Sequence, residues 1–155
     1  MARVVKPPAP VVFDGRTPSV FLAGSIEMGT AEDWQARVER GLADVEAVIL
    51  NPRREQWDAS WVQSISNSSF REQVEWELTG LERASVVAMY FAPGTKAPVT
   101  LLELGLCARV GRLVVCCPEG YWRRGNVEVV CHRYGVPLLP TLDDLVAEVR
   151  RQLLA

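Results

Sequence analysis

The sequence predicts an α/β domain, a three-layer sandwich in which helices cover both faces of a five-stranded, mainly parallel sheet. Short apolar runs alternate with helical segments five times along the 155 residues. The runs are apolar throughout, as is typical of strands buried on both faces. Because no linker or repeat interrupts this alternation, we expect one domain over residues 18–155. Residues 1–17, which include a Pro-rich stretch, are expected to form an extended N-terminal arm.

The first strand of the sheet is predicted at residues 19–23. A short edge strand is expected before it, at residues 11–13. Thr30 and Asp33 match the spacing of a capping box. They therefore predict a helix that ends near Leu42.

The second strand, residues 47–50, leads into the longest connection of the chain. Residues 52–68 contain no predicted element, and connections of this length in a compact domain are usually functional. Ser69 and Glu72 match a second capping box, which predicts a helix over residues 70–83.

The second half of the chain repeats strand and helix with shorter connections. Its helix at residues 98–108 is apolar almost all the way round, which predicts a buried element. Thr141 and Asp144 cap a final amphipathic helix that ends near residue 153. The remaining predicted elements are strands at residues 85–91, 113–117 and 136–139 and a short helix at residues 126–133.

Composition argues against several classes of function. The net charge of −2 gives no basic footprint for nucleic acid, and no apolar run is long enough to span a membrane. The four cysteines lack metal-binding spacing and there is one histidine, so we expect no metal site and no structural disulfide. No cofactor is implied. We expect a cytoplasmic protein in which carboxylates carry any chemistry.

Two carboxylates occupy positions at which side chains are normally buried. Glu103 lies in the middle of the apolar helix, and Glu77 lies at the edge of the apolar face of the preceding helix. A buried carboxylate is normally paired, protonated or used in chemistry, although either residue could reach solvent at a helix boundary. Two carboxylates in one cleft can divide the roles of nucleophile and acid or base, as in retaining glycosyl transfer.

Further candidates lie in the loops that follow the strands, where parallel sheets bind ligands. Gly24 and Ser25 would let a ligand approach the backbone, or would simply form a turn. Arg53 and Arg54 could bind a phosphate or a carboxylate, although adjacent surface arginines are often only solvated. Trp57 could stack on a nucleobase.

Four motifs occur in an order that resembles one enzyme family. They are Phe21-Leu22-Ala23-Gly24-Ser25-Ile26, Asn51-Pro52-Arg53-Arg54, Leu102-Glu103-Leu104-Gly105 and Gly125-Asn126-Val127. Together they are similar to the nucleoside 2′-deoxyribosyltransferase-like family, which is related to the 2′-deoxynucleoside 5′-phosphate N-hydrolases. The resemblance covers roughly residues 18–148 and implies a flavodoxin-like, Rossmann-like fold.

The resemblance also implies roles for individual residues. Glu103 would be the nucleophile, and Glu77 would engage the sugar and the base from a position where the family usually has Asp. Asn126 would complete the site of a neighbouring subunit in a homodimer or larger homo-oligomer. The residues expected to contact the nucleoside or nucleotide substrate are Phe21, Gly24, Ser25, Asn51, Arg53, Arg54, Trp57 and Asn126.

Two departures from the family pattern leave two functions open. Phe21 stands where family enzymes often carry a Tyr, and Lys96 and Ala97 stand near the place of an Asp that commonly precedes the Glu-Leu-Gly motif. The leading prediction is cleavage or exchange of the N-glycosidic bond of a (deoxy)nucleoside or nucleotide through a covalent intermediate on Glu103. The alternative is a nucleotide-binding or sensing module that has lost catalysis.

Overall fold

A single sheet runs through the centre of the computed structural model, which describes residues 1–26, 33–54 and 58–155. Its strand order is β1-β3-β2-β4-β5-β6, and every neighbouring pair is parallel. The predicted parallel α/β fold, of the flavodoxin-like type, is thereby confirmed, with six strands rather than five. The strands are β1 (Arg3–Val5), β2 (Ser19–Gly24), β3 (Val48–Leu50), β4 (Val86–Tyr90), β5 (Leu113–Cys116) and β6 (Leu138–Leu139).

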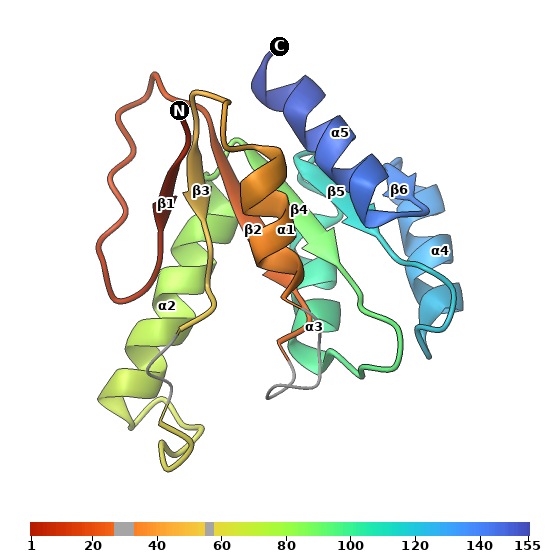
Figure 1. Ribbon diagram of the computed structural model, residues 1–155. Helices are drawn as coiled ribbons and strands as arrows, with labels where there is room; N and C mark the ends of the chain where they lie inside the picture. Colours follow the sequence, from red (N-terminus) through yellow and green to blue (C-terminus); the bar gives the residue numbers. More distant parts are fainter. Residues whose placement is uncertain (27–32, 55–57) are drawn as a thin grey trace.

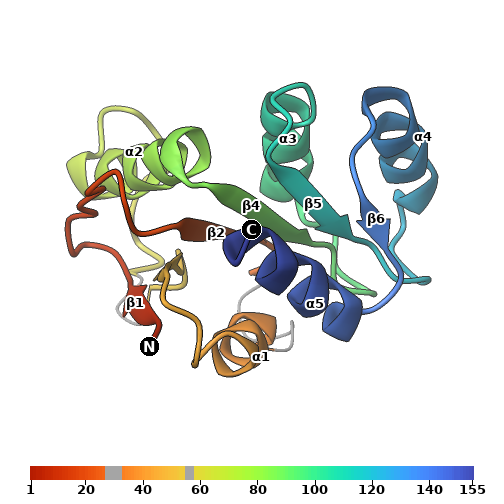
Figure 2. The same ribbon diagram turned by 90° about the horizontal axis from the view of Figure 1, so that it is seen from above.

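Helices cover both faces of the sheet. One face carries α1 (Trp34–Gly41) and α5 (Leu142–Leu153), and the other carries α2 (Ser68–Arg83), α3 (Pro98–Cys107) and α4 (Arg124–Tyr134), as Figures 1 and 2 show. The carboxyl ends of β2, β3 and β4 point towards the lower edge of the sheet in Figure 1. Among the described helices, none combines the length and the apolar character that a membrane span requires.

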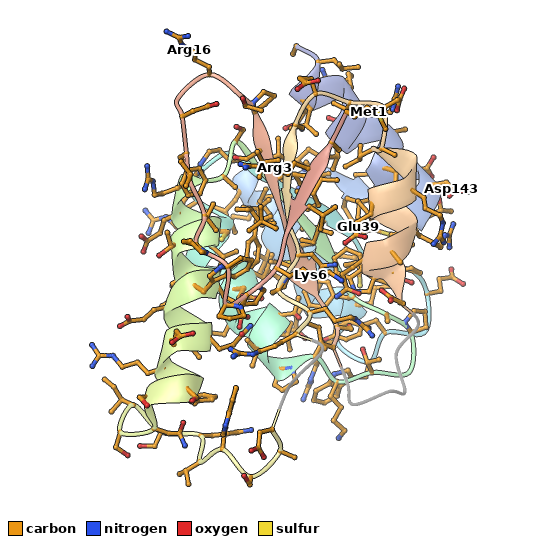
Figure 3. All side chains as sticks on the ribbon, turned by 60° about the vertical axis from the view of Figure 1, so that its left-hand side comes forward. Met1, Arg3, Lys6, Arg16, Glu39 and Asp143 are labelled. Carbon is orange, nitrogen blue, oxygen red and sulfur yellow. The ribbon has the colours of Figure 1, made fainter. Side chains whose placement is uncertain are left out.

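The additional strand comes from the N-terminal arm. Residues 3–5 pair with residues 48–50, and the N-terminal amine forms an ion pair with Glu46 at 2.7 Å. The expected edge strand at residues 11–13 is not formed. Because β1 and β2 flank β3 and run parallel to it, the chain must return along the sheet between them, and residues 6–18 make that return. Arg16 points away from the protein at one end of this return (Figure 3).

The predicted helix starts are partly confirmed. Thr141 accepts a hydrogen bond from the backbone N–H of Asp144 at 3.1 Å, as predicted for α5. Helix α2 is capped by Asn67, which accepts from the N–H of Phe70 at 3.0 Å, so the capping residue lies two positions before the predicted one. Asp33 itself caps α1; Thr30 lies outside the described residues.

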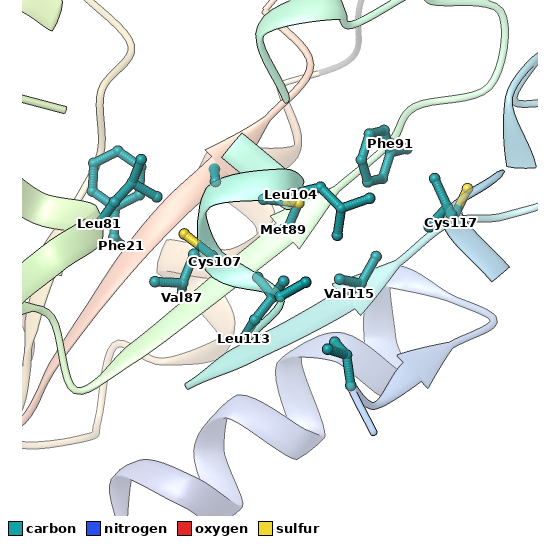
Figure 4. Packing of buried hydrophobic residues seen from close by; sticks show 14 of the residues in the cluster. Phe21, Leu81, Val87, Met89, Phe91, Leu104, Cys107, Leu113, Val115 and Cys117 are labelled. Carbon is teal, nitrogen blue, oxygen red and sulfur yellow. The ribbon is translucent and has the colours of Figure 1, made fainter. Parts of the chain in front are cut away.

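Two apolar clusters, one on each face of the sheet, form the core. The cluster beneath α2, α3 and α4 includes Phe21, Met89 and Leu104 (Figure 4). Phe21 is fully buried, and its ring occupies the space that a side chain at Gly80 of α2 would fill. Contact this close brings α2 down onto β2. It therefore sets the depth at which the polar residues of α2 lie.

Helix α3 is less buried than its sequence predicts. Thr100, Glu103, Leu104 and Cys107 face the core, whereas other apolar residues of the helix face outward. The outer layer of a three-layer sandwich leaves one side of each helix uncovered, so an all-round apolar helix exposes part of its apolar surface here. The exposed apolar residues on and just after α3, each more than half exposed, are Val99, Leu102, Leu106 and Val110.

Candidate active site

The two predicted carboxylates lie on neighbouring helices of the same face. Glu103 is carried by α3 and is 7% exposed, and Glu77 is carried by α2 and is partly buried. The negative charge of Glu77 raises the pKa of Glu103, so the two side chains interact electrostatically. Pairs of carboxylates in this arrangement are typical of sites that transfer protons or form glycosyl intermediates.

Burial controls the protonation of this carboxylate pair. It raises the pKa of Glu103 to about 8, with a further contribution from the charge of Glu77. Burial also raises the pKa of Glu77 to about 7, against the opposing effect of a hydrogen bond from Gln73. Near neutral pH both carboxyl groups therefore remain at least partly protonated.

Gln73, which sequence reasoning missed, links Glu77 to the segment that follows β3. Its amide nitrogen donates to Glu77 Oε2 at 3.0 Å and to the carbonyl oxygen of Pro52 at 3.1 Å. Arg54 Nη1 lies 3.5 Å from Gln73 Oε1, and the Arg54 guanidinium lies over the Trp61 ring, 4.9 Å from its centroid. The signal present in the sequence was the four-residue spacing between Gln73 and Glu77, which places both on one helix face.

The predicted arginines point to different helices. Arg54 faces α2, whereas Arg53 faces α1, where its Nε lies 3.7 Å from Asp33 Oδ1. Successive side chains of an extended segment point in opposite directions, which accounts for this division. The Nε of Arg53 is buried and makes no hydrogen bond. The site therefore has one arginine on each side of the sheet edge.

Asn51 shapes the start of this segment with its side chain. Its Oδ1 accepts from the backbone N–H of Arg53 at 2.9 Å, and its Nδ2 donates to Glu39 of α1 at 2.6 Å (Glu39 is labelled in Figure 3). Asn51 is almost fully buried. Its amide therefore holds the chain that carries Arg53 and Arg54.

Ser25 connects the end of β2 to the loop before α3. Its hydroxyl oxygen accepts from the N–H of Ala92 at 3.0 Å and lies 2.9 Å from Thr95 Oγ1. Thr95 donates to the carbonyl oxygen of Ala92 at 2.8 Å, so Ser25 must be the donor in the hydroxyl pair. Both capacities of the Ser25 hydroxyl are used within the protein, and they fix the loop that leads to Glu103.

Packing accounts for two of the other predicted substrate residues. A Cβ at Gly24 would lie 2.5 Å from the Trp34 ring and from the Tyr90 carbonyl oxygen, so glycine is required for helix α1 to approach the sheet. The fully buried Phe21 has no surface for a substrate to touch. Of the remaining candidates, Asn126 is exposed near the start of α4, and Trp57 lies outside the described residues.

The start of α3 is held by two aromatic residues that were not predicted as site residues. Tyr121 Oη and Trp122 Nε1 both donate to the carbonyl oxygen of Lys96, at 2.7 and 3.0 Å. The next residue, Ala97, has a left-handed backbone with φ of 46°, which is uncommon outside glycine. Such strained positions persist where surrounding contacts enforce them. These contacts set the direction of the helix that carries Glu103.

No cluster of three or more His, Cys, Asp or Glu side chains suited to a metal ion occurs among the residues that the structure describes. The four cysteines are buried and unpaired. The polar groups linked to Glu77 are the amide of Gln73 and, through that amide, the guanidinium of Arg54. This donor set suits a substrate with hydroxyl, carbonyl or phosphate oxygens.

Comparison with known proteins identifies the family of the chain. The family model described as nucleoside 2-deoxyribosyltransferase like matches residues 17–121, more than half of the chain. The matched region contains both Glu77 and Glu103, whereas Asn126 lies beyond it. No match was found among curated proteins. The chain therefore belongs to the nucleoside 2-deoxyribosyltransferase-like family.

Proposed function

We propose that this protein cleaves or exchanges the N-glycosidic bond of a (deoxy)nucleoside or nucleotide. The observation that carries the proposal is the interacting pair Glu77 and Glu103 on adjacent helices of a family member. In the first step, a carboxylate oxygen of Glu103 forms a bond to C1′ while the C1′–N bond breaks. The electron pair of that bond leaves with the base, which takes up a proton. Water or a second base then attacks C1′ and releases Glu103.

Glu77 is assigned the supporting role in this reaction. When ionised it accepts a hydrogen bond from a sugar hydroxyl, and when protonated it supplies a proton to the departing base. Arg54, which contacts Gln73 next to Glu77, would bind an anionic part of a nucleotide. We also propose that the protein is cytoplasmic and that the reaction requires no cofactor.

The direct test is product analysis with purified protein. Nucleosides and nucleotides with each of the common bases are incubated with the protein, and free base is separated by liquid chromatography. Mass spectrometry of the intact protein and of its peptides then shows whether a glycosyl group is attached to Glu103. Base release together with this adduct supports the proposal, and the absence of base release from every substrate contradicts it.

A binding or sensing module is the second candidate. It is favoured by Phe21, which places a buried ring without a hydroxyl on the strand beneath the site. The relevant measurement is a thermal-shift screen with the same nucleosides and nucleotides. Stabilisation by one of them without any base release would favour the module over the enzyme.

The proposed nucleophile predicts a characteristic pH dependence. Attack requires ionised Glu103, whose pKa is raised to about 8 by burial and by the charge of Glu77. We therefore expect kcat/KM to increase with pH and to level off above about pH 8. Steady-state rates measured from about pH 6 to about pH 10 test this. A profile that is flat across that range would contradict the role of Glu103 as the nucleophile.

We further propose that the exposed apolar face of α3 binds a second copy of the chain. Leu102 and Leu106 are exposed on α3, and Val129 is exposed on α4, three residues after Asn126. Residues three apart lie on the same side of a helix. Contact between copies through this surface would therefore carry Asn126 towards the partner, as the family resemblance implies.

Leu102→Glu is expected to dissociate this assembly, because it places a charge in an apolar contact. Analytical ultracentrifugation should show a smaller species for the variant than for the wild type. Val12→Glu is the matched control, since Val12 is equally exposed but lies in the N-terminal arm. Identical sedimentation of wild type and Leu102→Glu would exclude this surface as the interface.

A further inference from the structure

We propose that Gln73 is a positioning residue that holds the Glu77 carboxylate beside Glu103 and couples it to the segment following β3. The effect of Gln73 on catalysis rests on the proposed function, whereas its hydrogen bonds to Glu77 and Pro52 are independent of that function. Gln73 is 4% exposed and lies one turn before Glu77 on α2. The polar groups of a buried amide normally make hydrogen bonds.

The contacts of Gln73 allow only one orientation of its amide. Both hydrogens of Nε2 have acceptors, one on Pro52 O at 3.1 Å and one on Glu77 Oε2 at 3.0 Å. With Glu77 ionised, an amide rotated by half a turn would direct its oxygen at two other acceptors and at no donor. The position of one Glu77 oxygen is thus fixed relative to Pro52, which precedes Gln73 by 21 residues. The second oxygen of Glu77 receives no donor from Gln73.

The same amide connects Glu77 with Arg54. Arg54 Nη1 lies 3.5 Å from Gln73 Oε1 on the side opposite Glu77, and Trp61 supports the guanidinium from the long loop. A substrate group that binds Arg54 is therefore linked to Glu77 through Arg54 and Gln73. This arrangement allows binding at the loop to be transmitted to the carboxylate pair without direct contact.

Glu77 lies among three polar or charged side chains. Glu103 faces it from α3, Gln73 donates to it from its own helix, and Arg54 lies behind Gln73. The Gln73 hydrogen bond lowers the pKa of Glu77, against the larger effect of burial. The charge of Glu77 in turn raises the pKa of Glu103. Loss of one hydrogen bond should therefore change the protonation of both carboxylates.

The test is Gln73→Met, which preserves side-chain length and removes the amide. Carboxyl carbon NMR of wild type and variant, with Glu77 assigned through Glu77→Gln, follows the titration of Glu77 without any substrate. We expect the pKa of Glu77 to increase by about half a unit or more, because the ionised form loses a donor. In the kinetic assay kcat should fall about tenfold while KM changes less than about threefold, because positioning acts mainly on the reacting state.

Gln152→Met is the matched control. Gln152 donates to Glu148 at 3.0 Å with the same four-residue spacing, but on α5 at the opposite face of the sheet. This variant should leave Glu77 unchanged. Should Gln73→Met fail to fold, Gln73→Asn provides the same measurement, because the shorter amide cannot reach both acceptors.

An unchanged Glu77 titration in a folded Gln73 variant would overturn the positioning role. If instead Glu77 shifts while the wild type releases no base from any substrate, the positioning role stands and the proposed enzymatic function fails. The titration and the product analysis thus separate the two proposals. A fall in kcat in the control Gln152→Met, equal to that in Gln73→Met, would also overturn the inference.

Discussion

Glu103→Gln is expected to lower kcat/KM for base release by about a thousandfold or more, because it removes the atom that bonds to C1′. The substitution keeps the shape of the side chain and its position on α3. Substrate binding should therefore survive, and a nucleoside or nucleotide that stabilises the wild type should also stabilise the variant. Base release is measured by liquid chromatography under single-turnover and steady-state conditions. The glycosyl adduct seen by mass spectrometry should disappear.

The control for this prediction is Glu72→Gln. Glu72 lies on α2, one helix turn before Trp76, and its side chain is exposed. It should retain wild-type activity, so a loss confined to Glu103→Gln is attributable to the buried carboxylate. Equal rates for Glu103→Gln and wild type would contradict a covalent mechanism on Glu103, whether or not the substitution changes the stability of the protein.

The overall fold was predictable because its signals are local. Continuous apolar runs and helix caps occur within a few residues of each other, and together they defined the order of strands and helices. Strand β1 escaped prediction because residues 3–5 are too short to give a pattern. Their pairing depends on β3, more than forty residues away. The exposure of one side of α3 was not predicted for a related reason. The sequence of a helix does not specify how many neighbouring elements cover it.

The candidate site was likewise predictable from the sequence only in part. Helical spacing predicted a position for Glu77 at the edge of an apolar face, and the apolar surroundings of Glu103 predicted a buried helix. In the structure the two carboxylates interact from α2 and α3. Gln73 and Ser25 have roles that depend on acceptors distant in the chain, the carbonyl oxygen of Pro52 and the hydroxyl of Thr95. No sequence motif predicts such contacts. Phe21 was chosen through the family resemblance, but its ring is needed to pack β2 against Gly80.

Glu103→Gln is also expected to stabilise the fold at alkaline pH. The pKa of Glu103 is about 8 in the folded protein, against 4.5 for a free glutamate. Between these values the folded wild type holds a proton that the unfolded chain has released, so its stability falls as the pH rises through this window. A neutral amide has no such dependence. We compare the unfolding free energy of the variant with that of the wild type at each pH. This difference should be more favourable to the variant at about pH 8 than at about pH 5, by on the order of 2–4 kcal/mol.

Urea unfolding of the two proteins at a series of pH values measures this difference directly. Glu72→Gln serves again as the control, because Glu72 is exposed. The gain should increase up to about pH 8 and then remain constant, since above that pH Glu103 is ionised in both states. A difference that is independent of pH would contradict a buried, protonated Glu103. A confirmed gain would mean that this helix retains a destabilising carboxylate, which is expected when selection acts on chemistry rather than on stability.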